Sequence, residues 1–353
     1  MLSKYRNIFR NQLILVGPYP PPIGGVSTHI ERILPLLESK GIRYHLFNHG
    51  FFEGEKITST GKRYSWWIKF FFVSLLLRSY IRKSKAVIHF HIITFASYPF
   101  VFLFYFLITH RIFISIHNDD VFKYSPVKKA LYRVVISRLS ECRIICVSKR
   151  VTEYNSSIRK GSSIYLPALI MPATGHNLAL PHHHDPGKKL VCACIGKLND
   201  QKIIAYGFDL LFRLLADFKD MILYVFVGYE TGSEEDLIRK KYLEPALLDR
   251  VYFVYGKEFV SYVHNFSLFL RPNREDGFGV SVAEALLSGV LAIASDTCER
   301  IPGVTLFKSG DYDDLKQKYE LCREERSSNY PAEVDGNTYA VQLLALYQEA
   351  IAR

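Results

Sequence analysis

The chain has 353 residues, 49% of them hydrophobic and 22% charged, a composition that excludes a disordered protein and a length that predicts two ordinary domain cores. Its formal net charge of +11 is divided unevenly, since residues 1–175 carry 25 Lys or Arg against 8 Asp or Glu and the remainder carries 20 against 26. This division indicates a first domain that works beside a polyanion, either nucleic acid or an anionic membrane, unless the charge serves only solubility.

The first apolar run, residues 13–16, is short and ends at Gly17 and a group of prolines, so it does not have the pattern of a signal peptide. We expect it to be the first strand of a cytoplasmic protein. The six cysteines show no zinc-ligand spacing, and we expect them to fill the core in a reducing compartment.

A glycine pair, Gly24 and Gly25, separates this strand from a helix that extends to Leu37. Glycines between a strand and a helix leave backbone N–H groups accessible to an anion, so this pair is a candidate for ligand binding. The alternative is that two glycines after three prolines only shape a turn. A second strand is expected at 44–47, followed by a polar loop over 53–64.

Two strongly apolar stretches follow. Residues 66–85 mix Trp, Phe and Leu with Lys and Arg, which is typical of a helix at a lipid interface, although a core-facing helix with a basic edge is the alternative. Residues 97–109 predict a second helix, buried or partly immersed at a membrane face. Neither run is long enough to span a bilayer. Because the basic residues alternate with these runs and nucleic-acid motifs are absent, an anionic membrane is favoured over nucleic acid as the partner.

Strands are expected at 87–91 and 112–116, and the second of them ends at His117. A residue at the carboxyl end of a parallel strand points to where such sheets bind ligands, so His117 is a candidate site residue unless it is a plain turn histidine. His89 and His91 are expected to be structural. A basic helix over 123–139 and a strand over 144–148 complete this half.

The linker between the halves is expected at 176–189, where three adjacent histidines lack the partner ligands that a metal site needs. The second half repeats the alternation of strand and helix, with strands expected at 190–195 and 223–228 and a helix over 206–215. This alternation predicts parallel sheets of the α/β class. The predicted organisation is a first domain over 1–175, a second over 190–335 and a closing helix over 336–353.

The stretch from Arg271 to Gly289 concentrates the candidate chemistry. An apolar strand leads into a loop with Gly277 and Gly279 and then into a helix, whose N-terminal amides and positive dipole end suit an anion such as a diphosphate. Asp276 and Glu284 flank that position, and carboxylates accept hydrogen bonds from sugar hydroxyls. The alternative is that Ser281 to Glu284 is only a capping box.

This stretch resembles the signature of the retaining glycosyltransferases of family 4, an acidic residue followed by seven others and then Glu, with Gly-Phe-Gly after the first acid. The resemblance implies the GT-B architecture of two facing Rossmann-like domains, with the closing helix returning to the first domain. It also implies that Asp276 contacts the donor sugar and that Glu284 holds the nucleotide ribose. Asp stands here where Glu is commoner, which shortens the side chain by about 1.5 Å.

Other positions follow from the same resemblance. It implies that His117 lies beside the donor sugar, and that two cations after strand 190–195 neutralise the departing diphosphate. Lys197 matches the first cation. At the second, Tyr206 stands where the family usually has Lys, so Lys202 is the nearest substitute. The candidate catalytic residues are therefore His117, Asp276, Lys197 and Lys202, and the candidate donor-binding residues are Gly24, Gly25, Gly277, Phe278, Gly279, Val280, Ser281 and Glu284.

The implied function is transfer of a sugar from a UDP- or GDP-sugar to a glycan or lipid-linked acceptor, with retention, in the synthesis of O-antigen, capsule or exopolysaccharide. We expect no metal, cofactor or nucleic acid, and a peripheral position on the inner face of the cell membrane. One alternative is a nucleotide-sugar epimerase of the same fold. Another is a non-catalytic, membrane-associated partner of other transferases.

Overall fold

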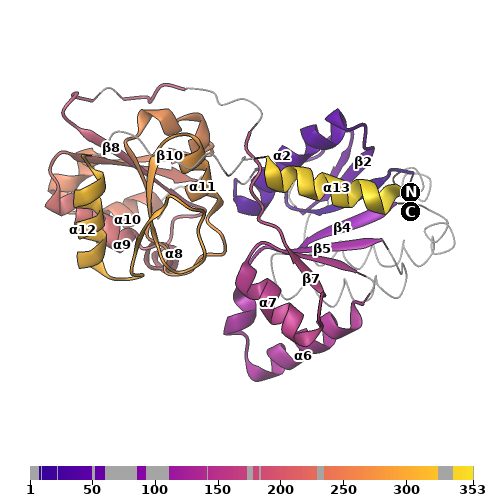
Figure 1. The fold of residues 1–353 in the computed structure, drawn as a ribbon. Coiled ribbons are helices and arrows are strands. Elements are labelled where there is room, and N and C mark those ends of the chain that lie inside the picture. The colour runs from indigo at the N-terminus through magenta and orange to yellow at the C-terminus, as the bar shows by residue number, and fades with distance from the viewer. Residues whose placement is uncertain are drawn as a thin grey trace. The chain divides into compact units, whose positions relative to one another are not determined.

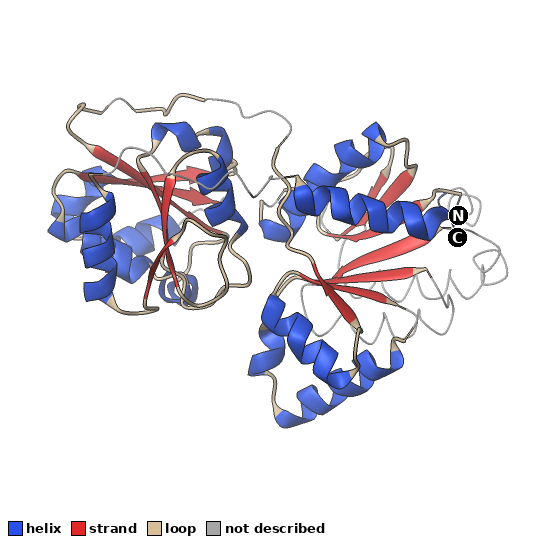
Figure 2. Ribbon diagram, viewed as in Figure 1, coloured by secondary structure: helices blue, strands red, loops and turns tan. Residues whose placement is uncertain are grey.

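The computed structural model divides the chain into two compact units. Unit 1 comprises Met1–Pro21, Gly25–Ile170 and Asn337–Arg353, and unit 2 comprises Pro22–Gly24 and Met171–Gly336. In each unit, helices pack on a parallel sheet (Figures 1 and 2). The structure describes residues 8, 10–21, 23–49, 52–59, 86–92, 111–140, 142–172, 178–182, 184–228, 234–324 and 337–352. The predicted interfacial helices at 66–85 and 97–109 lie outside these residues.

The described residues of unit 1 form a seven-stranded sheet in the order β3-β2-β1-β4-β5-β6-β7, with every neighbouring pair parallel. The strands are β1 (Leu13–Gly17), β2 (Tyr44–Asn48), β3 (Ile57–Ser59), β4 (Val87–Ile92), β5 (Ile112–Ile116), β6 (Arg143–Cys146) and β7 (Ser163–Tyr165). The α-helices are α2 (Gly25–Ser39), α6 (Pro126–Arg138), α7 (Lys149–Ile158) and α13 (Thr338–Ala352).

The described residues of unit 2 form a six-stranded sheet in the order β10-β9-β8-β11-β12-β13, again parallel throughout. The strands are β8 (Lys189–Ile195), β9 (Met221–Val227), β10 (Val251–Tyr255), β11 (Leu268–Arg271), β12 (Leu291–Ser295) and β13 (Thr305–Phe307). The α-helices are α8 (Asp200–Ala205), α9 (Phe208–Asp217), α10 (Glu234–Tyr242), α11 (Val280–Leu287) and α12 (Tyr312–Cys322).

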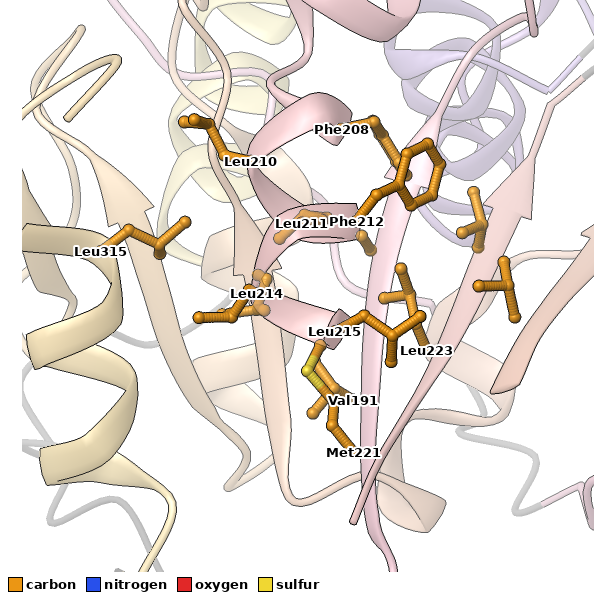
Figure 3. Close-up of a cluster of buried hydrophobic side chains, with 14 of the residues drawn as sticks. Val191, Phe208, Leu210, Leu211, Phe212, Leu214, Leu215, Met221, Leu223 and Leu315 are labelled. Atoms are coloured by element: carbon orange, nitrogen blue, oxygen red, sulfur yellow. The ribbon is translucent and has the colours of Figure 1, made fainter. Parts of the chain in front are cut away.

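The central strands are apolar along their whole length because helices cover both faces of a parallel sheet. Strand β9 is buried at every residue. Helix α9 turns its apolar face to this sheet, and Figure 3 shows Leu211 and Leu215 of the helix in one cluster with Val191 of β8 and Leu223 of β9. The predicted α/β class with parallel sheets is confirmed.

The last helix, α13, belongs to unit 1. Its residues Leu343, Leu344 and Tyr347 are buried in the same core cluster as Val87 of β4 and other residues of the sheet. Next to this core, Glu349 of α13 accepts two hydrogen bonds, 2.7 and 2.9 Å long, from the guanidinium of Arg143 on β6. The chain therefore re-enters unit 1 after completing unit 2.

Two helix starts differ from the prediction for reasons of backbone chemistry. The basic helix expected from residue 123 is a 3₁₀ turn at Asp120–Lys123 followed by α6, which begins at Pro126 because proline fits only the first turn of a helix. The helix expected from Tyr206 begins at Phe208, because Gly207 has a left-handed backbone with φ +67°. The stretch predicted as a polar loop at 53–64 contains the short strand β3.

None of the helices in the described part of the chain combines the length and the hydropathy needed to cross a bilayer.

Candidate active site

The candidate residues of unit 2 come from the carboxyl ends of two adjacent strands. Strand β8 leads into Gly196 and Lys197, and β11, which pairs with β8, ends at Arg271 before the loop to α11. Because the carboxyl ends of parallel strands lie at one edge of the sheet, the two loops share that edge. This is the edge at which open α/β sheets bind their ligands.

Helix α11 begins at a glycine in a left-handed conformation. Gly279 is its N-cap, with φ +73°, and no side chain caps the helix. The capping-box alternative is therefore wrong, since Ser281 lies inside the first turn and accepts a hydrogen bond of 3.1 Å from Arg271. Val280 and Ser281 start the helix and Phe278 is buried just before it.

The space beside Gly279, which the sequence suggested would be open to a ligand, is filled by an arginine. A Cβ at Gly279 would lie 2.0 Å from a terminal nitrogen of Arg300. No residue with a side chain fits here without displacing that guanidinium. Arg300 was not a candidate in the sequence analysis, because it lies 24 positions after Asp276 and outside the motif.

Asp276 is held between two arginines. Its Oδ2 accepts hydrogen bonds from Arg271 Nε at 2.5 Å and from Arg300 at 2.7 Å, and its Oδ1 accepts one from Arg271 at 2.9 Å. Burial by itself would raise the pKa of this carboxyl, but the charges and hydrogen bonds of Arg271 and Arg300 lower it well below the ordinary value. Asp276 is therefore ionised at neutral pH and fully paired.

Glu284, the second acid of the motif, is buried in the middle of α11. It and Arg271 both lie close enough to Cys194, near the end of β8, to affect its electrostatics. Burial raises the pKa of the Cys194 thiol to a value at which it stays protonated, so it is not a nucleophile.

The predicted cations after β8 lie near the surface. Lys197 forms an ion pair of 3.4 Å with Glu234 at the start of α10. Lys202 lies on α8 with its side chain exposed, and its Nζ is 5.5 Å from the centre of the Tyr206 ring. The guanidinium carbon of Arg271 lies 5.9 Å from the same ring. Arg271 is thus a second cation beside Tyr206, and its side chain is only 14% exposed.

In unit 1, the partly buried His117 follows β5 and lies against two buried histidines, His29 and His91. Its Nε2 lies 3.0 Å from Nδ1 of His91, and its ring centre is 5.7 Å from that of His29. Burial lowers the pKa of each of these three rings, to about 4 for His29, so they are neutral at physiological pH. A neutral ring can bind sugar hydroxyls as donor or acceptor.

His89 has the structural role that was expected, since its ring is fully buried and bonded to Tyr347 of α13 and to Ser115 of β5. The loop glycines of the first half differ from each other. Gly25 begins α2, and the space where a Cβ would lie is open. Gly24 belongs to unit 2. Its neighbour Ile23 donates a 3.2 Å hydrogen bond to the carbonyl of Gly228 in that unit.

The described histidines of the linker pack on tyrosines of the second sheet. The rings of His182 and Tyr252 are tilted with their centres 4.5 Å apart, and His184 Nε2 lies 2.6 Å from the hydroxyl of Tyr224. Among the described residues, no three His, Cys, Asp or Glu side chains are grouped as a metal site requires.

Residues 181–318 match the family of glycosyl transferases group 1. The group 1 match spans every strand of unit 2 that the structure describes. A stretch of 116 residues is 31% identical to the lipopolysaccharide core biosynthesis mannosyltransferase LpsB of Rhizobium meliloti, and it covers 32% of this chain and 32% of that protein. The matched region is thus about a third of the length of that relative.

Solved structures resemble nearly the whole chain, group 1 region included. The sucrose-phosphate synthase of Thermosynechococcus elongatus has a TM-score of 0.70 at 16% identity, over 97% of this chain and 99% of that one. The Anabaena protein HepE in complex with UDP-glucose has a TM-score of 0.65 at 13% identity, over 96% and 95%. A glycosyltransferase of Rickettsia africae has a TM-score of 0.66 at 11% identity, over 97% and 99%. The predicted GT-B fold is confirmed.

Proposed function

We propose that this protein is a glycosyltransferase that moves a sugar from a nucleotide-diphosphate donor, a UDP- or GDP-sugar, to a glycan or lipid-linked acceptor. The observation that carries the proposal is the group 1 match over the sheet whose strand β11 leads through the glycine loop into α11. The name of the bacterial relative, a lipopolysaccharide core mannosyltransferase, favours a role in surface polysaccharide synthesis. HepE, solved with UDP-glucose, supports a nucleotide sugar as donor.

The proposed chemistry depends on electrostatics and positioning. When the bond between the anomeric carbon and the diphosphate oxygen breaks, negative charge develops on the diphosphate, and the amides at the start of α11 with nearby cations stabilise it. Glu284 is proposed to hold the ribose hydroxyls and neutral His117 the sugar hydroxyls. Retention of configuration, and independence of metal ions, are parts of the proposal that the family resemblance suggests.

A surface of unit 1 supports the proposed peripheral position on the inner face of an anionic membrane. Helix α6 exposes Val127, Leu131 and Val134, which follow one another at helical spacing, with exposed fractions of 79%, 47% and 52%. Lys128 and Arg133 are also exposed on α6, and the helix contains no acidic residue. An apolar stripe with cations beside it fits a lipid surface with anionic headgroups.

The test of the transferase proposal is a thermal-shift screen against UDP-, GDP- and ADP-sugars, followed by a transfer assay with lipid-linked acceptors. A ligand that binds only the folded protein raises its melting temperature, so the true donor should stand out. Glu284→Gln should weaken donor affinity by about 10- to 100-fold, because a charged hydrogen-bond acceptor is lost. The matched control Glu275→Gln changes an exposed acid in the same loop and should leave affinity unchanged.

The outcomes separate the competing functions. If the chain converts the donor to an isomeric nucleotide sugar without any acceptor, it is an epimerase. If no nucleotide sugar raises the melting temperature of the wild type and no transfer is measured, the transferase proposal fails. The alternative of a non-catalytic partner of other transferases is then favoured.

A further inference from the structure

The carboxylate of Asp276 has no capacity left to bind a sugar. An ionised carboxylate accepts about four hydrogen bonds, and this one already receives two from Arg271, one from Arg300 and one of 3.1 Å from the amide of Gly277. A sugar hydroxyl could reach Asp276 only by displacing the amide of Gly277 or a guanidinium, and three of the four bonds are charge-assisted bonds from guanidiniums, which are stronger than a bond from a hydroxyl.

The side chains of Arg271, Asp276 and Arg300 together carry a net positive charge and are largely buried. Asp276 is the carboxylate that pairs with both Arg271 and Arg300, so the trio carries two positive charges and one negative charge. The side chains are 14%, 9% and 2% exposed for Arg271, Asp276 and Arg300. A buried excess of positive charge is costly unless an anion compensates it. The trio therefore favours an anionic ligand over a neutral one.

Both guanidiniums keep hydrogen-bond donors for such a ligand. Each terminal nitrogen of an arginine carries two N–H groups. Within the described residues, one terminal nitrogen of Arg271 bonds to Ser281 and the other to Asp276, one bond each. One terminal nitrogen of Arg300 bonds to Asp276 at 2.7 Å and to the carbonyl of Phe278 at 3.3 Å, whereas its Nε and its other terminal nitrogen make only long contacts of 3.4 Å with the carbonyl of Ser295. Planar guanidiniums with free N–H groups match phosphate oxygens.

The trio is also placed at the anion-binding end of α11. One terminal nitrogen of Arg300 occupies the position that a side chain at Gly279 would need, and it lies 3.3 Å from the carbonyl of Phe278, just before the helix. The glycine at the helix N-cap therefore makes room for this arginine. The charge of Arg300 adds to that of the amides in the first turn of α11, which carry the positive end of the helix dipole.

We propose that Arg271 and Arg300 bind the diphosphate of the donor, and that Asp276 is a positioning residue that holds the two guanidiniums rather than a ligand of the sugar. This inference rests on the proposed function, since it names the residues that recognise the diphosphate of the nucleotide sugar. It assigns the cationic role to buried arginines, in place of the exposed Lys202 that the sequence suggested.

The first experiment measures affinity for UDP and UMP, or for GDP and GMP if the donor screen selects guanine, in the chain of 353 residues. Arg271→Gln and Arg300→Gln should each lower the ratio of diphosphate to monophosphate affinity by about tenfold or more. Arg271→Lys and Arg300→Lys keep the charge but lose the planar fork, so intermediate losses are expected. Arg274→Gln is the matched control, because Arg274 lies in the same loop but pairs with Asp209 on α9.

The second experiment isolates Asp276 by comparing UDP with the UDP-sugar in Asp276→Asn. A positioning residue acts through the arginines, so both affinities should change by the same factor. Selective loss of affinity for the UDP-sugar, with UDP binding unchanged, would show that Asp276 is a sugar ligand and overturn its assignment.

The two proposals fail in different ways. If the wild type binds neither nucleoside diphosphates nor nucleotide sugars, the transferase function itself fails. If the wild type binds them and the folded arginine variants keep the wild-type ratio of diphosphate to monophosphate affinity, only the assignment of Arg271 and Arg300 is wrong. The lysine variants keep this comparison possible if a glutamine variant does not fold.

Discussion

Single residues at the carboxyl edge of the second sheet show how burial changes the meaning of a motif. Asp276 occupies the acidic position of the glycine-containing signature, but its chemistry is set by Arg271, five positions before it, and Arg300, 24 positions after it. Both arginines are hydrogen-bonded to it, which is what allows a charged group to be buried at all. The motif identifies where the site is, and its neighbours in space decide what the acid can do.

Gly207 provides a test of backbone strain at the same scale. It has φ +67°, and a Cβ there would lie 2.1 Å from the carbonyl oxygen of Pro272, which leads into the candidate loop. Gly207→Ala should therefore lower the free energy of unfolding of unit 2 by about 2 kcal/mol or more, measured by urea denaturation. Gly187→Ala is the control, because open space surrounds that position, and it should change stability by less than about 0.5 kcal/mol. Equal losses in both variants would contradict the steric explanation.

At the level of elements, α6 is a helix with an apolar residue stripe on its solvent side. The residues that face the core, Tyr132, Val135 and Ile136, are buried as ordinary amphipathic packing requires. The exposed stripe of Val127, Leu131 and Val134 does not pack in that core, and we therefore relate it to a membrane surface. The interfacial helix that the sequence predicts at 66–85 lies outside the described residues, and it stays a prediction.

Flotation with vesicles tests the role of α6. Leu131→Glu should reduce binding of the protein to vesicles that contain anionic lipid by several-fold, because it places a negative charge in the apolar stripe. Leu237→Glu is the matched control, since Leu237 is 63% exposed on α10 of unit 2. Binding of the wild-type protein to anionic vesicles should also fall at high salt. Equal binding to neutral and anionic vesicles, or no effect of Leu131→Glu, would contradict the proposal.

At the scale of the whole molecule, the two units have separate cores and different responses to acid. Burial holds the pKa of His29 at about 4 and that of His89 at about 3, so the folded form of unit 1 keeps these rings neutral. The unfolded chain binds protons below about pH 6.5, and stability therefore falls as the pH falls from 6.5 towards the folded values. In unit 2, the pKa of Asp276 is lowered from the ordinary value of 3.8, so its ionised form stabilises the fold above that pH. This contribution is lost only as the pH falls below 3.8.

Scanning calorimetry should therefore show two transitions that separate on acidification. Between pH 7.5 and pH 5 the transition of unit 1 should move to lower temperature, by a loss of about 2 kcal/mol per buried histidine at pH 5, while that of unit 2 stays in place. His29→Gln should reduce the pH dependence of the unit 1 transition. If both transitions move together, buried histidines are not the cause.

Much of the fold could be predicted from local patterns. Apolar runs of strand length, glycines at the turns and helical spacing are properties of short segments, and they predicted β8, β9, β11 and the site at α11 with its glycine loop. The misplaced helix starts at Pro126 and Phe208 were also local, since the proline and the preceding glycine were visible in the sequence. Local backbone preferences thus account for the elements, their order and the position of the motif.

The tertiary structure alone decided which side chains meet. Arg300 fills the space beside Gly279, His117 lies against His91, and Tyr347 of the last helix contacts His89 of β4, 258 positions earlier. Such contacts join residues whose separation along the chain is unrelated to their distance in space, so no pattern within a short segment encodes them. They arise when two sheets bury their faces under helices, because close packing leaves each buried charge or ring only a few positions in which its polar atoms are satisfied.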